Sequence, residues 1–154
     1  MKIRMWLVPF SLSVALLLIN SCEKRGCGTT NISKTNGHES HNMGENCMNC
    51  HKSGGEGKGC FLAAGTVYNN AGISIYANAT IRLYSQPNGA GSVVATIQGD
   101  AKGNFYTTDN IDFGNGLYPS VTNSSGQTSY MSSTISTGAC SSCHGVSQAK
   151  ISTL

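Results

Sequence analysis

One short motif occurs twice in this chain and constrains the fold more than any other feature. Residues 47–51 read Cys-Met-Asn-Cys-His, and residues 140–144 read Cys-Ser-Ser-Cys-His. Two cysteines three positions apart, followed at once by a histidine, form the covalent attachment signature of c-type haem. On one helical turn the two sulfurs can reach the two vinyl groups of a porphyrin, and the histidine then lies under the ring and can ligate the iron.

The sequence therefore predicts two covalently attached c-type haems. The expected thioether positions are Cys47, Cys50, Cys140 and Cys143, and the expected proximal iron ligands are His51 and His144. Zinc is the main alternative, because four thiolates from two C-x-x-C pairs can hold one Zn²⁺. Positions 51–139 separate the two pairs, far more than a zinc ribbon allows, and a histidine follows each pair. The motifs therefore favour haem over zinc or disulfides.

The first 21 residues have the character of a targeting segment. Lys2 and Arg4 precede a largely apolar stretch, residues 5–19, which is short for a membrane span. The string Leu18-Ile19-Asn20-Ser21-Cys22 resembles the lipoprotein box of bacterial lipoproteins. That resemblance implies acylation of Cys22 and a periplasmic or outer-membrane, cell-surface lipoprotein of the bacterial envelope. The alternative is an ordinary signal peptide with Cys22 present by chance.

Two cysteines remain after the haem and lipid assignments, namely Cys27 and Cys60. In an oxidising compartment two such thiols can form a disulfide, which here would tie the N-terminal arm to the first expected strand. The alternative is two free thiols, because a sequence does not give the Cα separation that a disulfide requires.

Charge excludes one class of partner. Only 11% of the 154 residues are charged, and the formal net charge of +3 becomes +1 once Lys2 and Arg4 are removed with the leader. There is no basic run, so the composition excludes a nucleic-acid surface. The length is that of one domain.

The middle of the chain has the pattern of β-structure. Residues 79–84 and 93–98 alternate apolar and polar side chains, which predicts half-buried strands. Further expected strands, rich in β-branched and aromatic residues, are 61–68, 104–108, 117–122 and 127–131. The glycine-rich run 52–59 predicts a loop, so the helices of a monohaem cytochrome c are not expected after the first motif. We therefore expect a mainly β fold, a small antiparallel β-sandwich with haem-binding segments at both ends.

Four strings within residues 61–126 resemble the carboxypeptidase regulatory-like (transthyretin-like) β-sandwich family. They are Gly65-Thr66-Val67-Tyr68, Asn78-Ala79-Thr80-Ile81-Arg82-Leu83, Asp100-Ala101-Lys102-Gly103-Asn104-Phe105 and Gly116-Leu117-Tyr118. The resemblance implies a seven-strand-type scaffold without catalysis, and Asn78 stands where a glycine is usual.

The expected segments are a lipoprotein signal peptide (1–21), a flexible tether (22–37), a first haem-binding segment (38–60), the β-sandwich (61–132) and a second haem-binding segment (133–154).

The haems are expected to complete this fold. About 70 residues make a thin core, and two porphyrins packed on the sheet would add buried apolar surface. An even number of strands between the motifs would bring the two haems close together.

The sixth iron ligands are expected to come from the segment before the first motif. His38 and His41 are the two histidines left after the proximal ligands, and we assign one to each haem. The alternative is a thioether at one or both haems, with Met131 as the strongest candidate and Met43 and Met48 as the others.

The sequence leaves three function classes open. A diheme c-type cytochrome would carry electrons at the envelope to redox partner proteins, such as other cytochromes, from a lipid anchor. A self-assembling subunit of an extracellular cytochrome filament or surface complex is the alternative. A diheme peroxidase-type enzyme is least favoured, because the acidic residues form no pair at a catalytic spacing. We therefore expect no catalytic residue.

Overall fold

The computed structural model describes residues 26–154. The expected signal peptide, residues 1–21, and the expected lipidation site, Cys22, lie outside the described residues. The described part contains eight strands and three short 3₁₀ turns, and no α-helix. The strands are β1 (Ala63–Tyr68), β2 (Thr80–Tyr84), β3 (Val93–Gln98), β4 (Asn104–Thr107), β5 (Tyr118–Thr122), β6 (Thr128–Tyr130), β7 (Gly138–Ala139) and β8 (Ile151–Ser152). The 3₁₀ turns are η1 (Cys47–Asn49), η2 (Pro87–Gly89) and η3 (Cys140–Ser142).

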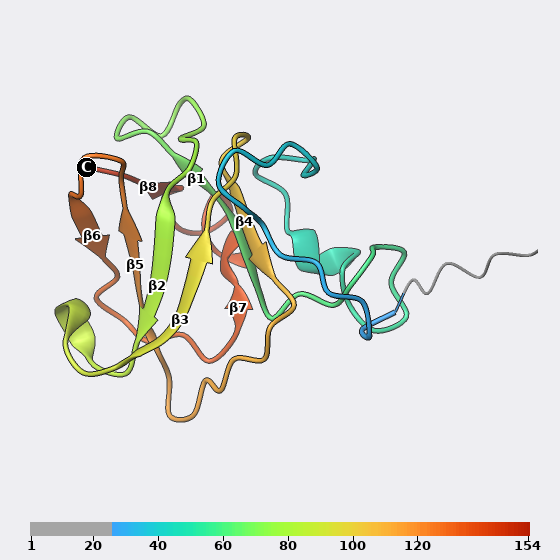
Figure 1. The fold of residues 1–154 in the computed structure, drawn as a ribbon. Coiled ribbons are helices and arrows are strands. Elements are labelled where there is room, and N and C mark those ends of the chain that lie inside the picture. The colour runs from blue at the N-terminus through green and yellow to red at the C-terminus, as the bar shows by residue number, and fades with distance from the viewer. Residues whose placement is uncertain (1–25) are drawn as a thin grey trace, which may run out of the picture.

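The strands form two four-stranded sheets, which lie face to face (Figure 1). The sheet with the order β3-β2-β5-β6 is antiparallel throughout. In the other sheet β1 and β4 are antiparallel, whereas β7 and β8 both run parallel to β1. The expected mainly β fold with antiparallel pairing is confirmed for the strands of residues 61–132. The sequence did not predict β7 and β8, which lie in the expected second haem-binding segment and add parallel pairings to β1. After β6 the chain crosses to the other sheet and enters it in the direction of β1.

Six of the strands coincide with the segments that the sequence pattern predicts. In β2, Ile81 and Leu83 are buried, and the three residues that alternate with them are half-buried. β3 is less regular because it lies at the edge of its sheet, where Ile97 is buried but Val93 and Val94 are exposed. β7 and β8 are two residues long each, which is too short for any periodicity to be seen.

The main core lies between the two sheets. Its buried members are Ala63, Val67, Ala79, Ile81, Leu83, Ile97, Phe105, Ile111, Leu117 and Val121. β1 is buried along its whole length, on both faces. Ala63 and Val67 belong to the main core, whereas Ala64 packs with Phe61 and Tyr106 in a second cluster on the other face. This division follows from the strand geometry, in which successive side chains point to opposite faces.

The N-terminal arm, residues 26–60, covers that other face of β1 and β4 and forms a third layer (Figure 1). Ser33, in the expected tether, pairs with the edge of β4: its N–H donates to Tyr106 O over 2.9 Å, and its Oγ accepts from Tyr106 N–H over 2.8 Å. Further along, Asn104 Nδ2 donates to Ser40 Oγ and to His41 O, both over 3.0 Å. The segment before the first motif is therefore held against the sheet by hydrogen bonds to β4.

Candidate functional site

Both C-x-x-C-H motifs form the same single turn. In the first, Cys47 O accepts from Cys50 N–H over 3.3 Å and from His51 N–H over 3.0 Å. In the second, Cys140 O accepts from Cys143 N–H and His144 N–H over the same two distances. An asparagine caps the first turn, because Asn46 Oδ1 accepts from Met48 N–H over 3.2 Å. Two segments far apart in the sequence thus present two cysteines and a histidine in one geometry.

In each motif one thiol faces inward and the other is exposed. Cys47 packs against the cluster of Phe61, Ala64 and Tyr106, and Cys140 packs against the main core, whereas Cys50 and Cys143 are exposed. Burial raises the pKa of the Cys47 thiol, and it raises the pKa of Cys140 to about 12. Negative charge on the Cys143 and Cys47 thiolates contributes to the same rise in the pKa of Cys140. All four motif cysteines are free of disulfides.

The two motif histidines are oriented in the same way, by backbone carbonyls that follow them in the chain. His51 Nδ1 lies 3.0 Å from Lys58 O, and His144 Nδ1 lies 2.6 Å from Ala149 O. Because a carbonyl oxygen only accepts, Nδ1 carries the proton in both rings and Nε2 keeps a free lone pair. This is the arrangement that orients a metal-ligating imidazole. Sequence reasoning missed both carbonyls, since a backbone oxygen leaves no mark on residue identity.

The glycine-rich loop after the first motif wraps around His51. A Cβ at Gly57 would lie 2.7 Å from His51 Cγ, so only glycine permits this approach. The ring of Phe61 stacks on the His51 ring, with centroids 4.0 Å apart and an interplanar angle of 8°. His51 is accordingly buried, at 8% exposure. The loop that looked unstructured in sequence therefore serves to hold this imidazole.

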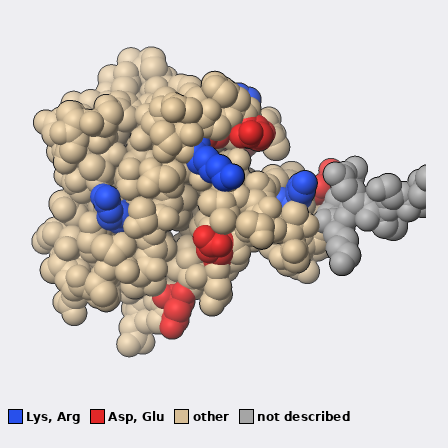
Figure 2. All heavy atoms as spheres, viewed as in Figure 1, with Lys and Arg blue, Asp and Glu red and all other residues tan. Residues whose placement is uncertain are grey.

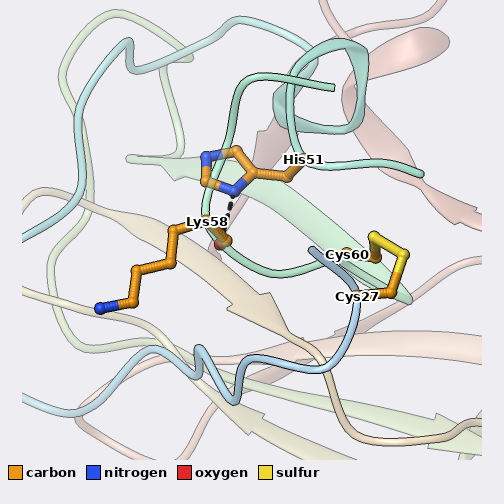
Figure 3. The surroundings of a disulfide bond; sticks show 4 residues. All are labelled: Cys27, His51, Lys58 and Cys60. Atoms are coloured by element: carbon orange, nitrogen blue, oxygen red, sulfur yellow. Dashed lines mark hydrogen bonds between the residues drawn. A yellow bond between two sulfur atoms is a disulfide. The ribbon is translucent and has the colours of Figure 1, made fainter. Parts of the chain in front are cut away.

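A disulfide joins Cys27 to Cys60, with Cα atoms 4.5 Å apart, and fixes the end of this loop to the start of the arm (Figure 3). The carbonyl of Lys58 lies two residues before Cys60 and accepts from both His51 Nδ1 and Asn31 Nδ2, the latter over 2.8 Å. The bridge therefore closes a loop of chain that contains the whole first motif.

Of the two histidines expected as sixth ligands, His41 lies beside the first motif. Its ring centroid is 6.0 Å from that of His51, with an interplanar angle of 33°. His38 is exposed, and its N–H donates to Glu39 Oε2 over 3.0 Å. Met48 packs against the Phe61 cluster.

A cavity of about 610 Å³ opens between the two sheets beside the second motif. Cys140, Cys143 and His144 line one part of it, and Met131 lines it from the end of β6. Its volume is in the range of cofactor and ligand pockets. A smaller cavity of about 130 Å³ brings Met43, from the arm, next to His144.

Both motifs lie next to β1, on its two faces. The parallel pairing of β7 with β1 aligns Ala64 with Ala139, so that Cys140 comes to lie beside Gly65. A Cβ at Gly65 would lie 3.2 Å from Cys140 Cβ and 2.8 Å from Phe105 Cζ, so this approach requires glycine. Seven strands lie between the motifs, so the expected even number of strands is wrong. The two motifs instead lie close together because β7, which precedes the second motif, pairs in parallel with β1, which follows the first.

The comparisons with known proteins found no family model, curated protein or solved structure that matches this chain. In residues 26–154 no helix has the length and apolar character needed to cross a membrane. Within the same residues no three or more His, Cys, Asp or Glu side chains are grouped so that they could hold a bare metal ion.

Proposed function

We propose that the protein is a diheme c-type cytochrome that carries electrons at the bacterial cell envelope. One observation carries the proposal: two distant C-x-x-C-H segments adopt one turn, and each histidine donates Nδ1–H to a backbone carbonyl, which leaves Nε2 for iron. A structural turn needs neither the paired thiols nor this histidine orientation.

The surroundings of the two motifs support the proposal. At the first motif, Cys47 packs beside the buried apolar cluster of Phe61, Ala64 and Tyr106 while Cys50 is exposed, and at the second motif both thiols line the 610 Å³ cavity. When bound, haem supplies reversible one-electron chemistry of its iron. The chain's own residues hold it by thioethers at Cys47 and Cys50 and at Cys140 and Cys143, orient the proximal ligands His51 and His144, and exclude water from one side of each site.

Location and partners follow from the leader. Acylation at Cys22 would anchor the chain to a membrane of the envelope, and the Cys27–Cys60 disulfide is consistent with an oxidising compartment. Charged side chains are sparse and of mixed sign on the face in Figure 2. Redox partner proteins, such as other cytochromes, would then dock largely through uncharged surface, and we propose no enzymatic activity.

A second candidate function is a subunit of an extracellular cytochrome filament or surface complex. The observation that favours it is the edge strand β3, where Val93 and Val94 are 49% and 40% exposed. Apolar edge strands favour pairing with another chain. Sedimentation of the holoprotein distinguishes the two candidates, since the carrier stays monomeric and the subunit forms concentration-dependent assemblies.

The test of the main proposal is a pyridine haemochrome assay on protein purified from a host that matures c-type cytochromes. We expect two c-type haems per chain, and one in a variant with Cys140→Ala and Cys143→Ala. Holoprotein without a c-haem spectrum would refute the proposal. Rapid peroxide turnover would instead favour the enzyme.

A further inference from the structure

We infer that the two sites are chemically different: His41 is the sixth ligand at the first motif, and Met131 is the sixth ligand at the second. The inference rests on the proposed haem attachment and adds to it the ligand set of each site. It also assigns no ligand role to His38.

The separation of two rings carries the first half of the inference. Two imidazoles that ligate one metal from opposite sides, each through a nitrogen about 2 Å away, have ring centres about 6 Å apart. The rings of His41 and His51 are 6.0 Å apart. His51 Nδ1 is occupied by Lys58 O, so its Nε2 is the atom available to the metal. The carbonyl of His41 is held by Asn104 Nδ2, which fixes the backbone of His41 on the same layer as the first motif.

Strand register carries the second half. Leu83 pairs with Pro119 across β2 and β5, and Ser120 pairs with Tyr130 across β5 and β6. The next position along places Met131 opposite Pro119, and Met131 N–H donates to Pro119 O over 2.9 Å. Residues directly opposite each other share a face of a sheet, so Met131 faces the same side as Leu83, which is buried in the core. Met131 therefore faces into the space between the sheets.

The larger cavity selects Met131 over Met43. Cys140, Cys143, His144 and Met131 all line the 610 Å³ cavity. Met43 shares only the 130 Å³ cavity with His144, and neither Cys140 nor Cys143 lines that one. A porphyrin held by both thiols must lie where both thiols point, which is the larger cavity. Met131 follows β6, in one sheet, and His144 follows β7 and η3, beside the other sheet, and both residues line this cavity.

The two ligand sets give the sites different affinities for an electron. Methionine ligation raises the reduction potential relative to two histidines. The second site should therefore be reduced first in a titration, and the first site last.

The experiment compares matched pairs of variants in the holoprotein, read by optical and electron paramagnetic resonance spectra. The wild type should show two low-spin haems and a methionine-to-iron charge-transfer band of one-haem intensity. Met131→Leu, which keeps the volume of the side chain, should abolish that band, and Met43→Leu should leave it. His41→Ala should convert one haem to high spin and leave the band, and His38→Ala should change neither.

The spin state and the midpoint potentials of one further variant, Met131→His, complete the test. Met131→His should restore a low-spin second haem and lower the higher of the two midpoint potentials, leaving the other unchanged. Absence of the band in the wild type, its loss in Met43→Leu alone, or a spin change in His38→Ala alone would overturn the ligand assignment. A haemochrome count below two per chain would instead refute the proposed function, so the two failures are distinguishable.

Discussion

At the residue scale, Asn78 has an unusual backbone conformation that its side chain and its contact with Asn36 explain. Asn78 has a φ of 61°, in the left-handed region that favours glycine. Its side chain also makes two hydrogen bonds of 2.9 Å with Asn36: Asn78 Oδ1 accepts from Asn36 N–H, and Asn78 Nδ2 donates to Asn36 Oδ1. Asparagine thus tolerates the turn and ties the arm to the sandwich.

Asn78→Ala should lower the free energy of unfolding by about 1–3 kcal/mol, because alanine pays for positive φ and both hydrogen bonds are lost. Asn78→Gly keeps the turn and loses only the bonds, so it should cost less. Chemical denaturation of the two variants measures the difference. Equal destabilisation by alanine and glycine would show that the conformation of Asn78 is not limiting.

The buried thiol of Cys140 makes a pH prediction for protein prepared without haem. Its pKa is raised from 9.0 to about 12, so the folded state favours the protonated thiol more than the unfolded state does. This stabilisation is fully present below about pH 9 and is lost as pH rises toward 12. We expect roughly 1–3 kcal/mol to be lost between about pH 9 and 11.

Cys140→Ala is the control, because it removes the titrating group and should flatten that part of the pH profile. Holoprotein should behave like the control, since a thioether does not titrate. Identical profiles for haem-free wild type and Cys140→Ala would contradict the burial of this thiol.

At the scale of elements, alternation of apolar and polar residues predicted β2 and β3, and the content of β-branched and aromatic residues predicted β1, β4, β5 and β6. The apolar side chains at every second position of β2 identify it as a strand. The two C-x-x-C-H motifs can be recognised from their residue types alone. β7 and β8 could not be predicted, because a strand of two residues is too short to show an alternating pattern. Their pairing with β1 also joins segments that are far apart in the sequence. The carbonyls of Lys58 and Ala149 could not be predicted either, and the sequence pattern does not encode a cavity. His41 was predicted as a ligand from its type and place, but its separation from His51 depends on the hydrogen bonds between the arm and β4.

The arm is the element that the Cys27–Cys60 bridge should stabilise most. The bridge closes a loop across a sequence separation of 33, for which chain entropy predicts about 3–4 kcal/mol. The variant Cys27→Ser/Cys60→Ser should therefore unfold at a lower temperature in calorimetry while it still binds two haems. An unchanged melting temperature would mean that the hydrogen bonds of Ser33, Ser40 and His41 to β4 hold the arm alone.

In the proposed cytochrome, the two haems should contribute unequally to the stability of the whole molecule. The cavity at the second motif lies between the sheets, whereas the first motif lies in the arm, on the side of β1 away from the main core. Removing the second haem by Cys140→Ala/Cys143→Ala should thus lower the melting temperature more than removing the first by Cys47→Ala/Cys50→Ala, because more apolar surface becomes hydrated. Variants that lose one haem but melt like the parent would show that the sandwich is complete without porphyrin.

The position of β1 between the two motifs has a mechanical consequence. One sheet layer separates them, and no hinge or linker intervenes, so in the proposed cytochrome the spacing between the two irons is set by the stiffness of a hydrogen-bonded strand. Any rotation of the protein on a membrane surface would carry both centres together as one rigid body. Such a protein would sample different orientations toward a partner while the coupling between its own two centres stayed constant.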